Sequence, residues 1–442
     1  MIAARVGDWF GRNRFAQSVA VLAGGTAAGQ LLVVAAAPVL TRLYLPAQFG
    51  SLTVYVSLLT FLLGVATLRY HMAVPLAEDA RTLASLLVLC LSVVAGVSIL
   101  IAIAVATSGG AIASWTSTPA LEPLLWLLPL GFLGAGVNQV LTAWAVRRDR
   151  FGVLARVRIG QSAGQTGTQI GLGVLGLGTS GLILGDAIGR AAGSVGLARM
   201  AWDDLHAHLR AVTPRDVLRV ASRYRRFPLI STWTGLVASA GAQLPTLLIA
   251  SLYGASVVGW FGLCQRLLSM SFVLVASAIG TVFFSESARL ANAQPERLMR
   301  LFWATVSRSG LVAIALVIGV ATAAPVLFGP IFGSEWAEAG RYAQVLAISA
   351  GFQFVNRSVG STATVVERQD LDFYAETAWT LLASGSLLVA WYFGASPYVC
   401  MIIFSIGVAL GSVASLSLSW YAIHSAINRG GALPPAHREE PS

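Results

Sequence analysis

Charged residues are scarce in this sequence of 442 residues: they make up 11% of it, and lysine is absent. About a quarter of an ordinary soluble domain is charged, and a chain of this length would form roughly two or three such domains. Because 56% of the residues are hydrophobic, there are too few polar side chains to cover them. The composition excludes soluble enzymes and nucleic-acid-binding proteins, and it predicts an all-α polytopic membrane protein.

Cysteine and histidine are also rare, with 3 and 5 residues. Cys90, Cys264 and Cys400 lie in separate apolar runs without C-x-x-C spacing, which argues against disulfides and metal sites. The sequence contains no P-loop, no G-x-S-x-G and no H-E-x-x-H pattern. We therefore expect no catalytic residues, no metal and no cofactor.

Long apolar runs, by contrast, fill most of the chain. A helix needs roughly 20 apolar residues to cross a bilayer core of about 30 Å. Twelve runs of this kind are separated by charged or Gly-, Pro- and Ser-rich gaps, at residues 17–40, 50–68, 83–106, 120–146, 158–177, 180–200, 228–252, 256–282, 302–328, 340–364, 373–394 and 397–424. An even number of spans places both termini on one side of the membrane.

The 29 basic residues, all arginine, indicate which side this is. Of these, 24 lie in the tails and gaps on the side of the N-terminus, whereas only Arg42 and Arg341 lie on the opposite side. Positive residues near span ends stay in the cytoplasm. Both termini are therefore predicted to be cytoplasmic, and the net charge of +10 reflects topology and not a nucleic-acid partner.

The longest inner gap, residues 201–227, mixes apolar residues with arginines as an amphipathic segment does. We expect it to lie along the cytoplasmic membrane surface. It would join two six-helix lobes, residues 1–200 and 228–425, and residues 426–442 would form a cytoplasmic tail.

A weak internal repeat supports two equivalent lobes. The segment from Pro38 to Gly50 resembles the segment from Pro245 to Gly259, each with a proline followed by an aromatic residue and glycine. Transporters with such repeats place their substrate site between the two halves. The repeat therefore favours a transporter.

Ionisable residues at membrane depth are the main candidates for function, because a charge near the bilayer centre costs roughly 2.5 to 3.5 kcal/mol. Arg266 lies ten residues inside the predicted eighth span, about 15 Å deep at a rise of 1.5 Å per residue. It lies beside Gln265, and it either pairs with an acid of another helix or lines a cavity. Arg357 in the tenth span either faces a cavity or extends to the membrane interface.

Asp186 and Arg190 in the sixth span are spaced i, i+4, so they share one helical face and can neutralise each other. We interpret them as a structural ion pair. They are also the candidates for coupling to an ion.

Four further residues lie near the ends or on the faces of the first two spans. Arg42 and Arg69 are interface anchors or cavity residues, and Thr26 and Gln30 offer uncharged polar lining. With Arg266 and Arg357 they would form a cationic cavity. Because a guanidinium can bind two phosphate oxygens at once, we expect an anionic cargo.

Several short motifs resemble bacterial polysaccharide flippases of the Wzx type. They occur in the expected order over most of the chain, at Pro38–Gly50, Leu68–Tyr70, Leu76–Asp79, Arg147–Phe151, Gly181–Asp186, Tyr224–Pro228 and Gln243–Leu268. The last two spans depart from this pattern. The chain thus looks like a member of the multidrug/oligosaccharidyl-lipid/polysaccharide exporter (MOP) superfamily.

The resemblance implies two lobes around a V-shaped cavity, alternating access, and a location in the bacterial inner membrane. The implied cargo is an undecaprenyl-diphosphate-linked oligosaccharide, moved from the cytoplasmic to the outer leaflet. Membrane lipids, a polymerase and a chain-length regulator of the same pathway are implied partners, and a proton or sodium ion is a possible coupling ion. The first, second, seventh and eighth helices line the cavity in relatives, which favours Arg266 over Arg357.

Two alternatives stay open at this point. A multidrug or metabolite cation antiporter of the same superfamily would need membrane-embedded acids, and the first span has none. An O-antigen polymerase or ligase would carry a large outer loop, whereas the longest outer gap, residues 107–118, is short and uncharged.

Overall fold

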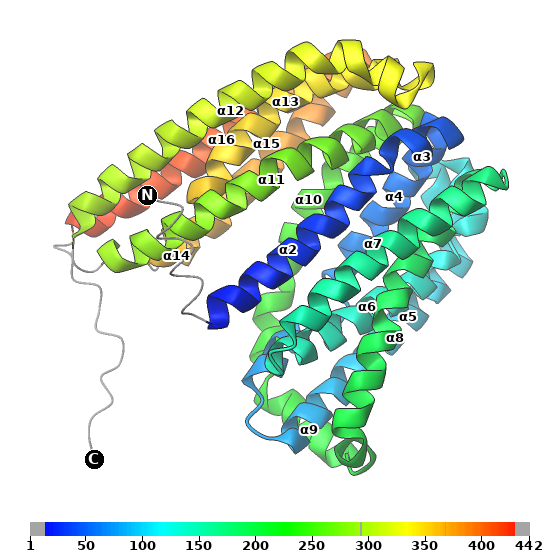
Figure 1. Cartoon of the computed structure of the whole chain (residues 1–442), viewed down its shortest axis with the longest axis vertical. Coiled ribbons are helices and arrows are strands. Elements are labelled where there is room, and N and C mark those ends of the chain that lie inside the picture. The colour runs from blue at the N-terminus through cyan, green and yellow to red at the C-terminus, as the bar shows by residue number, and fades with distance from the viewer. Residues whose placement is uncertain (1–13, 292–293, 367, 429–442) are drawn as a thin grey trace. The chain divides into compact units, whose positions relative to one another are not determined.

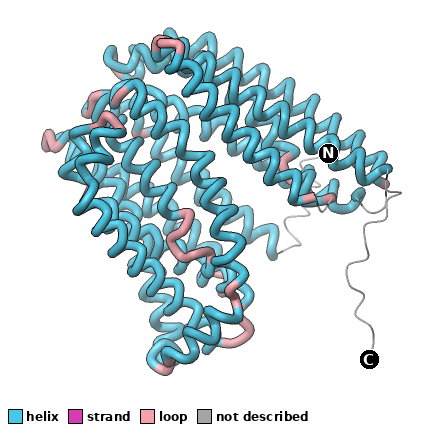
Figure 2. Tube along the Cα trace, turned by 180° about the vertical axis from the view of Figure 1, so that it is seen from behind, coloured by secondary structure: helices cyan, strands magenta, loops and turns pink. Residues whose placement is uncertain are grey.

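The computed structural model describes residues 14–291, 294–366 and 368–428. Every regular element in these residues is helical (Figure 2), which confirms the all-α prediction. Twelve of the described helices have 18 or more residues: α2 Arg14–Ala35, α4 Pro46–Leu63, α5 Ala80–Trp115, α6 Leu127–Arg147, α7 Phe151–Val174, α8 Gly178–Arg210, α10 Thr232–Tyr253, α11 Ala255–Ala291, α12 Pro295–Phe332, α13 Ala337–Val359, α15 Gln369–Tyr392 and α16 Pro397–Asn428. Each overlaps one of the twelve predicted spans.

Shorter elements join or extend these helices. They are α3 Ala37–Leu43, η1 Tyr70–Leu76, η2 Pro119–Leu124, α9 Pro214–Arg223, η3 Phe227–Ser231, η4 Ser334–Trp336 and α14 Thr362–Val365. One of them, η3, is a π-helix directly before α10.

Seven of the described helical segments are both long and apolar enough to cross a membrane, and the bent helix α11 is an eighth. The helices α7, α8, α13 and α15 are long enough, but they do not pass the same test of hydropathy and charge. The chain is therefore an all-helical polytopic membrane protein with seven or eight clear spans. Twelve crossings and cytoplasmic termini stay predictions.

The helices labelled in Figure 1 belong to two compact units, and the boundary along the chain falls between Gly259 and Trp260. The first unit contains the helices from α2 to α10, and α10 packs against α4 within it. The second unit contains most of α11 and the helices from α12 to α16, where α12 packs against α13 and α15 against α16. The predicted lobes of six helices each stay a prediction.

The predicted span at residues 83–106 is shorter than the helix that contains it. Most of the predicted outer gap, residues 107–118, is also helical. Helix α5 continues to Trp115, because the segment contains no proline or charge that would end it. The helix stops where Thr116 and Thr118 exchange a hydroxyl hydrogen bond of 2.7 Å and Ser117 adopts a φ of 50°.

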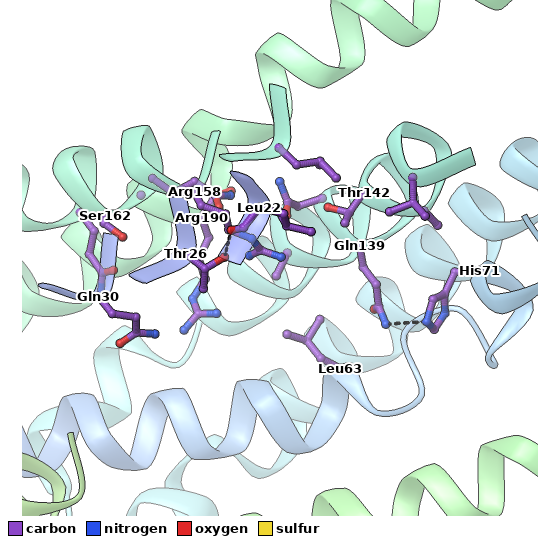
Figure 3. Close-up of a pocket in the computed structure, with 18 residues that line it drawn as sticks. Leu22, Thr26, Gln30, Leu63, His71, Gln139, Thr142, Arg158, Ser162 and Arg190 are labelled. Carbon is purple, nitrogen blue, oxygen red and sulfur yellow. Dashed lines mark hydrogen bonds between the residues drawn. The ribbon is translucent and has the colours of Figure 1, made fainter. Parts of the chain in front are cut away.

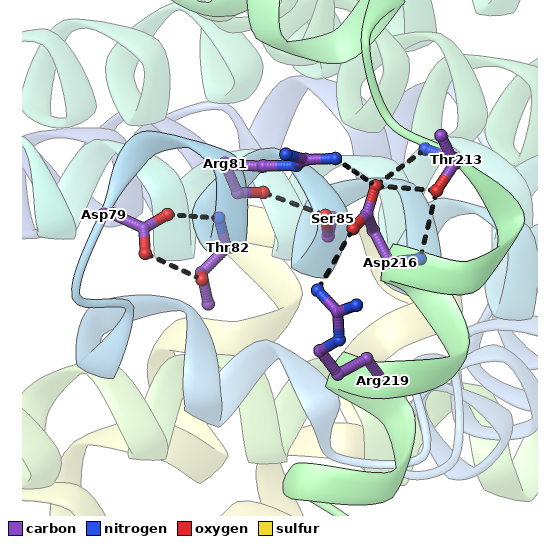
Figure 4. A network of polar contacts seen from close by, with 7 residues as sticks. All are labelled: Asp79, Arg81, Thr82, Ser85, Thr213, Asp216 and Arg219. Carbon is purple, nitrogen blue, oxygen red and sulfur yellow. Dashed lines mark hydrogen bonds and ion pairs between the residues drawn. The ribbon is translucent and has the colours of Figure 1, made fainter.

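The predicted amphipathic segment, residues 201–227, consists of the end of α8, then α9 and η3. Figure 4 shows how α9 is held on α5: the Asp216 carboxylate accepts hydrogen bonds from the Thr213 hydroxyl at 2.7 Å and from Arg81 at 3.0 Å. These contacts lower the pKa of Asp216 to about 2, and the hydrogen bonds from Thr213 have the largest effect. The first unit thus binds this segment through a buried carboxylate.

Candidate functional site: a polar cavity in the first unit

A cavity of about 780 Å³ lies within the first unit, between α2, α6, α7 and α8 and the turn from α4 to η1. This volume is typical of small-molecule sites. Figure 3 shows side chains of its lining, and 11 of the 18 lining residues are polar. The polar lining residues are Thr26, Gln30, His71, Asn138, Gln139, Thr142, Arg158, Gln161, Ser162, Gln165 and Arg190.

Helices α7 and α8 form one wall of the cavity by an unusually close approach. Three glycines of α8, spaced four residues apart, each face a glutamine of α7: the pairs are Gly185 with Gln169, Gly189 with Gln165, and Gly193 with Gln161. A Cβ atom at Gly189 would lie 2.5 Å from the Cβ of Gln165 and 2.9 Å from its Cα. Small residues allow helices in membranes to pack backbone to backbone, and here they also fix the positions of the glutamines.

The glutamines reach across this interface to an ion pair on α8. Gln165 donates a hydrogen bond of 3.0 Å to Asp186, and Gln161 donates one of 3.3 Å to the backbone carbonyl of Arg190. Asp186, only 2% exposed, accepts two hydrogen bonds from Arg190, at 2.6 and 3.2 Å. The structure therefore brings together the i, i+4 pair that the sequence suggests, and Arg190 enters the cavity wall with its charge already paired.

His71 lies at the other wall, where the chain turns out of α4. Two consecutive residues with left-handed backbone, Leu68 (φ 45°) and Arg69 (φ 62°), make this turn. The His71 ring nitrogens lie 2.5 Å from the Thr67 hydroxyl and 3.1 Å from the Gln139 amide nitrogen (Figure 3). Since the amide nitrogen only donates, Nε2 accepts and the ring proton lies on Nδ1.

The charge state of His71 follows from its surroundings. Burial, and secondly the nearby positive charge of Arg69, lower the pKa of His71 to about 4. His71 is therefore a neutral imidazole at physiological pH. It contributes hydrogen-bonding groups to the cavity, and no charge.

Three polar groups of the cavity lining have no partner among the described residues. The Nδ2 atom of Asn138, a residue that is 7% exposed, and the Oε1 atom of Gln139 are buried without a hydrogen bond. Arg158 makes no ion pair or hydrogen bond with any residue that the structure describes. The two amide atoms have almost no accessible surface, whereas Arg158 is exposed. None of the residues that line the cavity is acidic.

Among the residues predicted from the sequence, Thr26, Gln30 and Arg190 line this cavity. The other five predicted cavity residues do not. Arg42 on α3, Gln265 on α11 and Arg357 on α13 are exposed, whereas Arg69 and Arg266 are half-buried. Their proposed role in binding the cargo therefore stays a prediction.

Arg69 has the most specific surroundings of these arginines. Its guanidinium lies against Gly235 of α10, in the space that a Cβ atom at residue 235 would occupy. Its Nε atom is buried and has no hydrogen-bond partner. An unpaired buried guanidinium nitrogen is costly, and it marks Arg69 as a group that can still accept an anionic partner.

Sequence reasoning missed His71, Asn138 and Gln139, and the glutamines of α7. The glutamines were detectable, because Gln161, Gln165 and Gln169 repeat at every fourth residue of a span otherwise rich in glycine. The glycines of α8 repeat with the same period. Two such stripes in neighbouring spans predict a close, polar helix pair.

The second unit contains a different kind of cavity. A groove of about 290 Å³ lies between α13 and α16, and its lining is apolar except for Ser405. The Ser405 hydroxyl donates a hydrogen bond of 3.2 Å to the backbone carbonyl of Val345. The groove therefore offers no free polar group.

Comparison with solved structures shows the fold of the chain. An inward-facing multidrug resistance MATE family transporter of the MOP superfamily matches with a TM-score of 0.68 and 14% identity, over 91% of this chain and 96% of that one. The lipid II flippase MurJ in an inward closed conformation matches with a TM-score of 0.67 and 12% identity, over 90% and 86%. The MOP-superfamily fold implied by the sequence motifs is confirmed.

Sequence comparison relates the chain to polysaccharide biosynthesis. The teichuronic acid biosynthesis protein TuaB of Bacillus subtilis is 26% identical over 195 residues, which are 44% of this chain and 36% of TuaB. The chain thus spans about a third of the length of this relative. The profile of the polysaccharide biosynthesis protein family matches residues 39–341, more than half of the sequence. This chain therefore belongs to the polysaccharide biosynthesis protein family.

Proposed function

We propose that this protein is a flippase that moves a polyprenyl-diphosphate-linked oligosaccharide from the cytoplasmic to the outer leaflet of the bacterial inner membrane. Its family places it in polysaccharide biosynthesis, and its fold is shared with a lipid II flippase. The observation that carries the proposal is the polar cavity of the first unit, which has an unpaired arginine and no acidic lining residue. Such a lining suits a hydroxylated, anionic cargo.

The same observation argues against a cation antiporter. A cation cargo requires an acidic side chain that faces it, because a desolvated positive charge must be paired. Asp186 does not line the cavity, and its oxygens accept hydrogen bonds from two residues that do, Arg190 and Gln165. The cavity therefore favours anionic over cationic cargo.

The diphosphate is proposed to be bound by arginines of the membrane-embedded helices. Arg266 is the first candidate, and Arg69, Arg42 and Arg357 are the others. An outward-moving charge of about minus two would gain roughly 4 to 5 kcal/mol from a membrane potential of about 100 mV. Exchange of the cargo for a proton or a sodium ion could drive export equally well, and Asp186 and Arg190 are then the candidates for coupling to that ion. A polymerase and a chain-length regulator would act on the exported glycan.

The test is an export assay in a strain that lacks the gene and any redundant transporter. Lipid-linked repeat units should accumulate on the cytoplasmic face, and the intact gene should relieve this accumulation. Arg266→Ala should abolish the relief, whereas Arg266→Lys, which keeps the charge but loses the bidentate fork, should retain part of it.

The matched control is Arg341→Ala on α13, because Arg341 is an exposed arginine paired with Glu338. This variant should export normally. Unchanged surface glycan and lipid precursors in the deletion strain would contradict the proposed function. Normal export by a stably inserted Arg266→Ala protein would contradict only the role of Arg266.

A further inference from the structure

We propose that the exposed face of α9 and the short segment after it bind the headgroups of anionic phospholipids. This face, which we call the arginine surface, consists of Arg215, Leu218, Arg219 and Ser222 of α9 and of Arg225 and Arg226 between α9 and η3. The proposal concerns the lipids around the protein and not its cargo, so it goes beyond the proposed function and does not depend on it.

Helix α9 has one face that packs on the first unit and one that does not. Asp216 and Val220 are buried, and the Tyr70 hydroxyl of η1 donates a hydrogen bond of 3.2 Å to the backbone carbonyl of Ala221. Asp216 also accepts a hydrogen bond from Arg81 of α5. The four α9 residues of the arginine surface are all exposed, and their spacing of three or four positions places them together on the other face. The packed face therefore fixes the direction in which the arginine surface points.

The positive charge of this surface has few counterions in the described part of the chain. Arg215, Arg225 and Arg226 make no ion pair or side-chain hydrogen bond with any residue that the structure describes. Asp216 is the only acidic residue from position 205 to position 285, and its buried carboxylate already accepts several hydrogen bonds. Glu78 is already paired with another arginine of α9. A cluster of unbalanced cations attracts anions from the surroundings.

The position of α9 identifies the source of these anions. Helix α9 contacts the first turn of α5 through Arg81 (Figure 4), two residues before the apolar run at 83–106. After α9, the chain passes through η3 directly into α10. Both α5 and α10 are long and apolar enough to cross a membrane. Because the polar headgroups of a bilayer surround the ends of such helices, the arginine surface lies at the level of the headgroups.

Exposed apolar side chains accompany the arginines. Leu218 is 70% exposed on α9, and Leu229 of η3 and Trp233 of α10 are 65% and 67% exposed. Arginines beside exposed leucine and tryptophan are typical of segments that lie in the membrane interface. A free phosphate ion would pair with the arginines but would leave these apolar groups in water, whereas a phospholipid contacts both. An anionic phospholipid is therefore the partner that fits the whole surface.

The experiment measures lipid contact at α9 itself, in the full-length protein in nanodiscs. Cys90, Cys264 and Cys400 are buried, so a bimane fluorophore can be attached selectively through Ser222→Cys, a change at an exposed position of α9. Phosphatidylglycerol and phosphatidylcholine, each with a nitroxide near the headgroup, are compared as quenchers in a phosphatidylcholine bilayer. Phosphatidylglycerol should reach half of its maximal quenching at a mole fraction at least about fivefold lower, since one arginine near a membrane surface contributes about this factor.

Charge variants test whether the arginines cause the preference. The triple variant Arg215→Gln, Arg225→Gln and Arg226→Gln should be quenched equally by the two lipids. Changing the same three residues to lysine should keep most of the preference, because the attraction depends on the positive charge near the membrane surface. Salt at about 1 M, where the Debye length is roughly 3 Å, should weaken the preference in the parent protein.

The matched control removes the same number of charges elsewhere. Arg297, Arg300 and Arg308 are exposed arginines of α12 in the second unit. Their replacement by glutamine, with the fluorophore still at position 222, should leave the preference for phosphatidylglycerol unchanged. Thermal unfolding identifies any variant that fails to fold. If the triple variant of the arginine surface fails to fold, Arg215→Gln alone takes its place, and the preference should then fall several-fold.

Three results would overturn the proposal. Equal quenching of the parent protein by both lipids would show that α9 does not select anionic headgroups. Quenching by neither lipid would place α9 away from the bilayer, against water or a soluble partner. An equal loss of preference in the α12 control would assign the effect to the net charge of the protein and not to this surface. None of these results would affect the proposed flippase function, which is decided by lipid-linked intermediates in cells.

Discussion

Each unit of the chain contains a cavity, and the two linings have opposite chemistry. The cavity of the first unit, about 780 Å³, is lined by amide, hydroxyl, imidazole and guanidinium groups beside aliphatic side chains. The groove of the second unit, about 290 Å³, is lined by aliphatic and aromatic side chains and one satisfied serine. The first lining therefore contains charged and amide groups, whereas the second offers aliphatic surface, one aromatic ring and a hydroxyl that is already bonded.

The two units also differ in what holds their helices together. In the first unit, glycines and buried hydrogen bonds join α7 to α8 around the Asp186–Arg190 pair. In the second unit, aromatic pairs such as Phe272 with Phe354, 6.0 Å apart, pack in apolar surroundings. Polar groups in a membrane must be satisfied internally, so a polar cavity demands this network and an apolar groove does not. The same kind of substitution should therefore have larger effects in the first unit.

The largest effect is expected from Asp186→Ala. Removing one member of a buried ion pair leaves the other charge uncompensated and costs about 3 to 5 kcal/mol. The matched substitution in the second unit is Glu338→Ala, which removes the exposed partner of Arg341 and should cost about 0 to 1 kcal/mol. Thermal unfolding of the detergent-purified proteins measures both.

A double variant refines this test. Asp186→Leu with Arg190→Met replaces the pair by apolar side chains of similar size, and it should recover much of the lost stability. If Asp186→Ala were as stable as the parent protein, the ion pair would not support the cavity wall. The contrast between the two units would then be wrong.

The sequence predicted the helices better than the site. Each of the twelve apolar runs coincides with a long described helix, because hydrophobic length is a local property. The pairing of Asp186 with Arg190 followed from the spacing on one helix. In contrast, His71 and Gln139 are 68 residues apart and meet only in the fold. No local pattern could place them at one cavity.

The predicted arginines illustrate a second limit. Depth along a helix indicates how costly a charge is, but it does not indicate which way the side chain points. Arg357 was chosen by depth and does not line the cavity, whereas Arg158, which was only one of the 24 arginines counted on the inner side, does line it. Both side chains are exposed. The bounds of α5 were also missed, because a sequence without a breaking residue gives no sign of where a helix ends.

A smaller effect is expected from Gly189→Ala. The added Cβ would collide with Gln165, so the helices must move apart, and overpacking of this kind costs about 1 to 3 kcal/mol. Gly385→Ala on α15 is the control, because nothing lies within 4 Å of its Cβ position. That variant should be neutral or more stable by up to about 1 kcal/mol, since alanine favours the helix. A lower unfolding temperature for Gly189→Ala together with an unchanged or higher one for Gly385→Ala would support the contrast between the two units. Equal changes in unfolding temperature would contradict it.

The smallest effect is expected from pH, through His71. Burial, and secondly Arg69, lower the pKa of His71 from 6.5 to about 4. Between these values the unfolded chain binds more protons than the folded one, so stability is complete above pH 6.5 and falls towards pH 4. The loss should be on the order of 1 to 2 kcal/mol for a partly buried group. Thermal unfolding across this range should show the slope in the parent protein and in His424→Asn, a change at an exposed residue of α16. His71→Asn should flatten the slope, and a slope that survived this change would place the titrating group elsewhere in the chain.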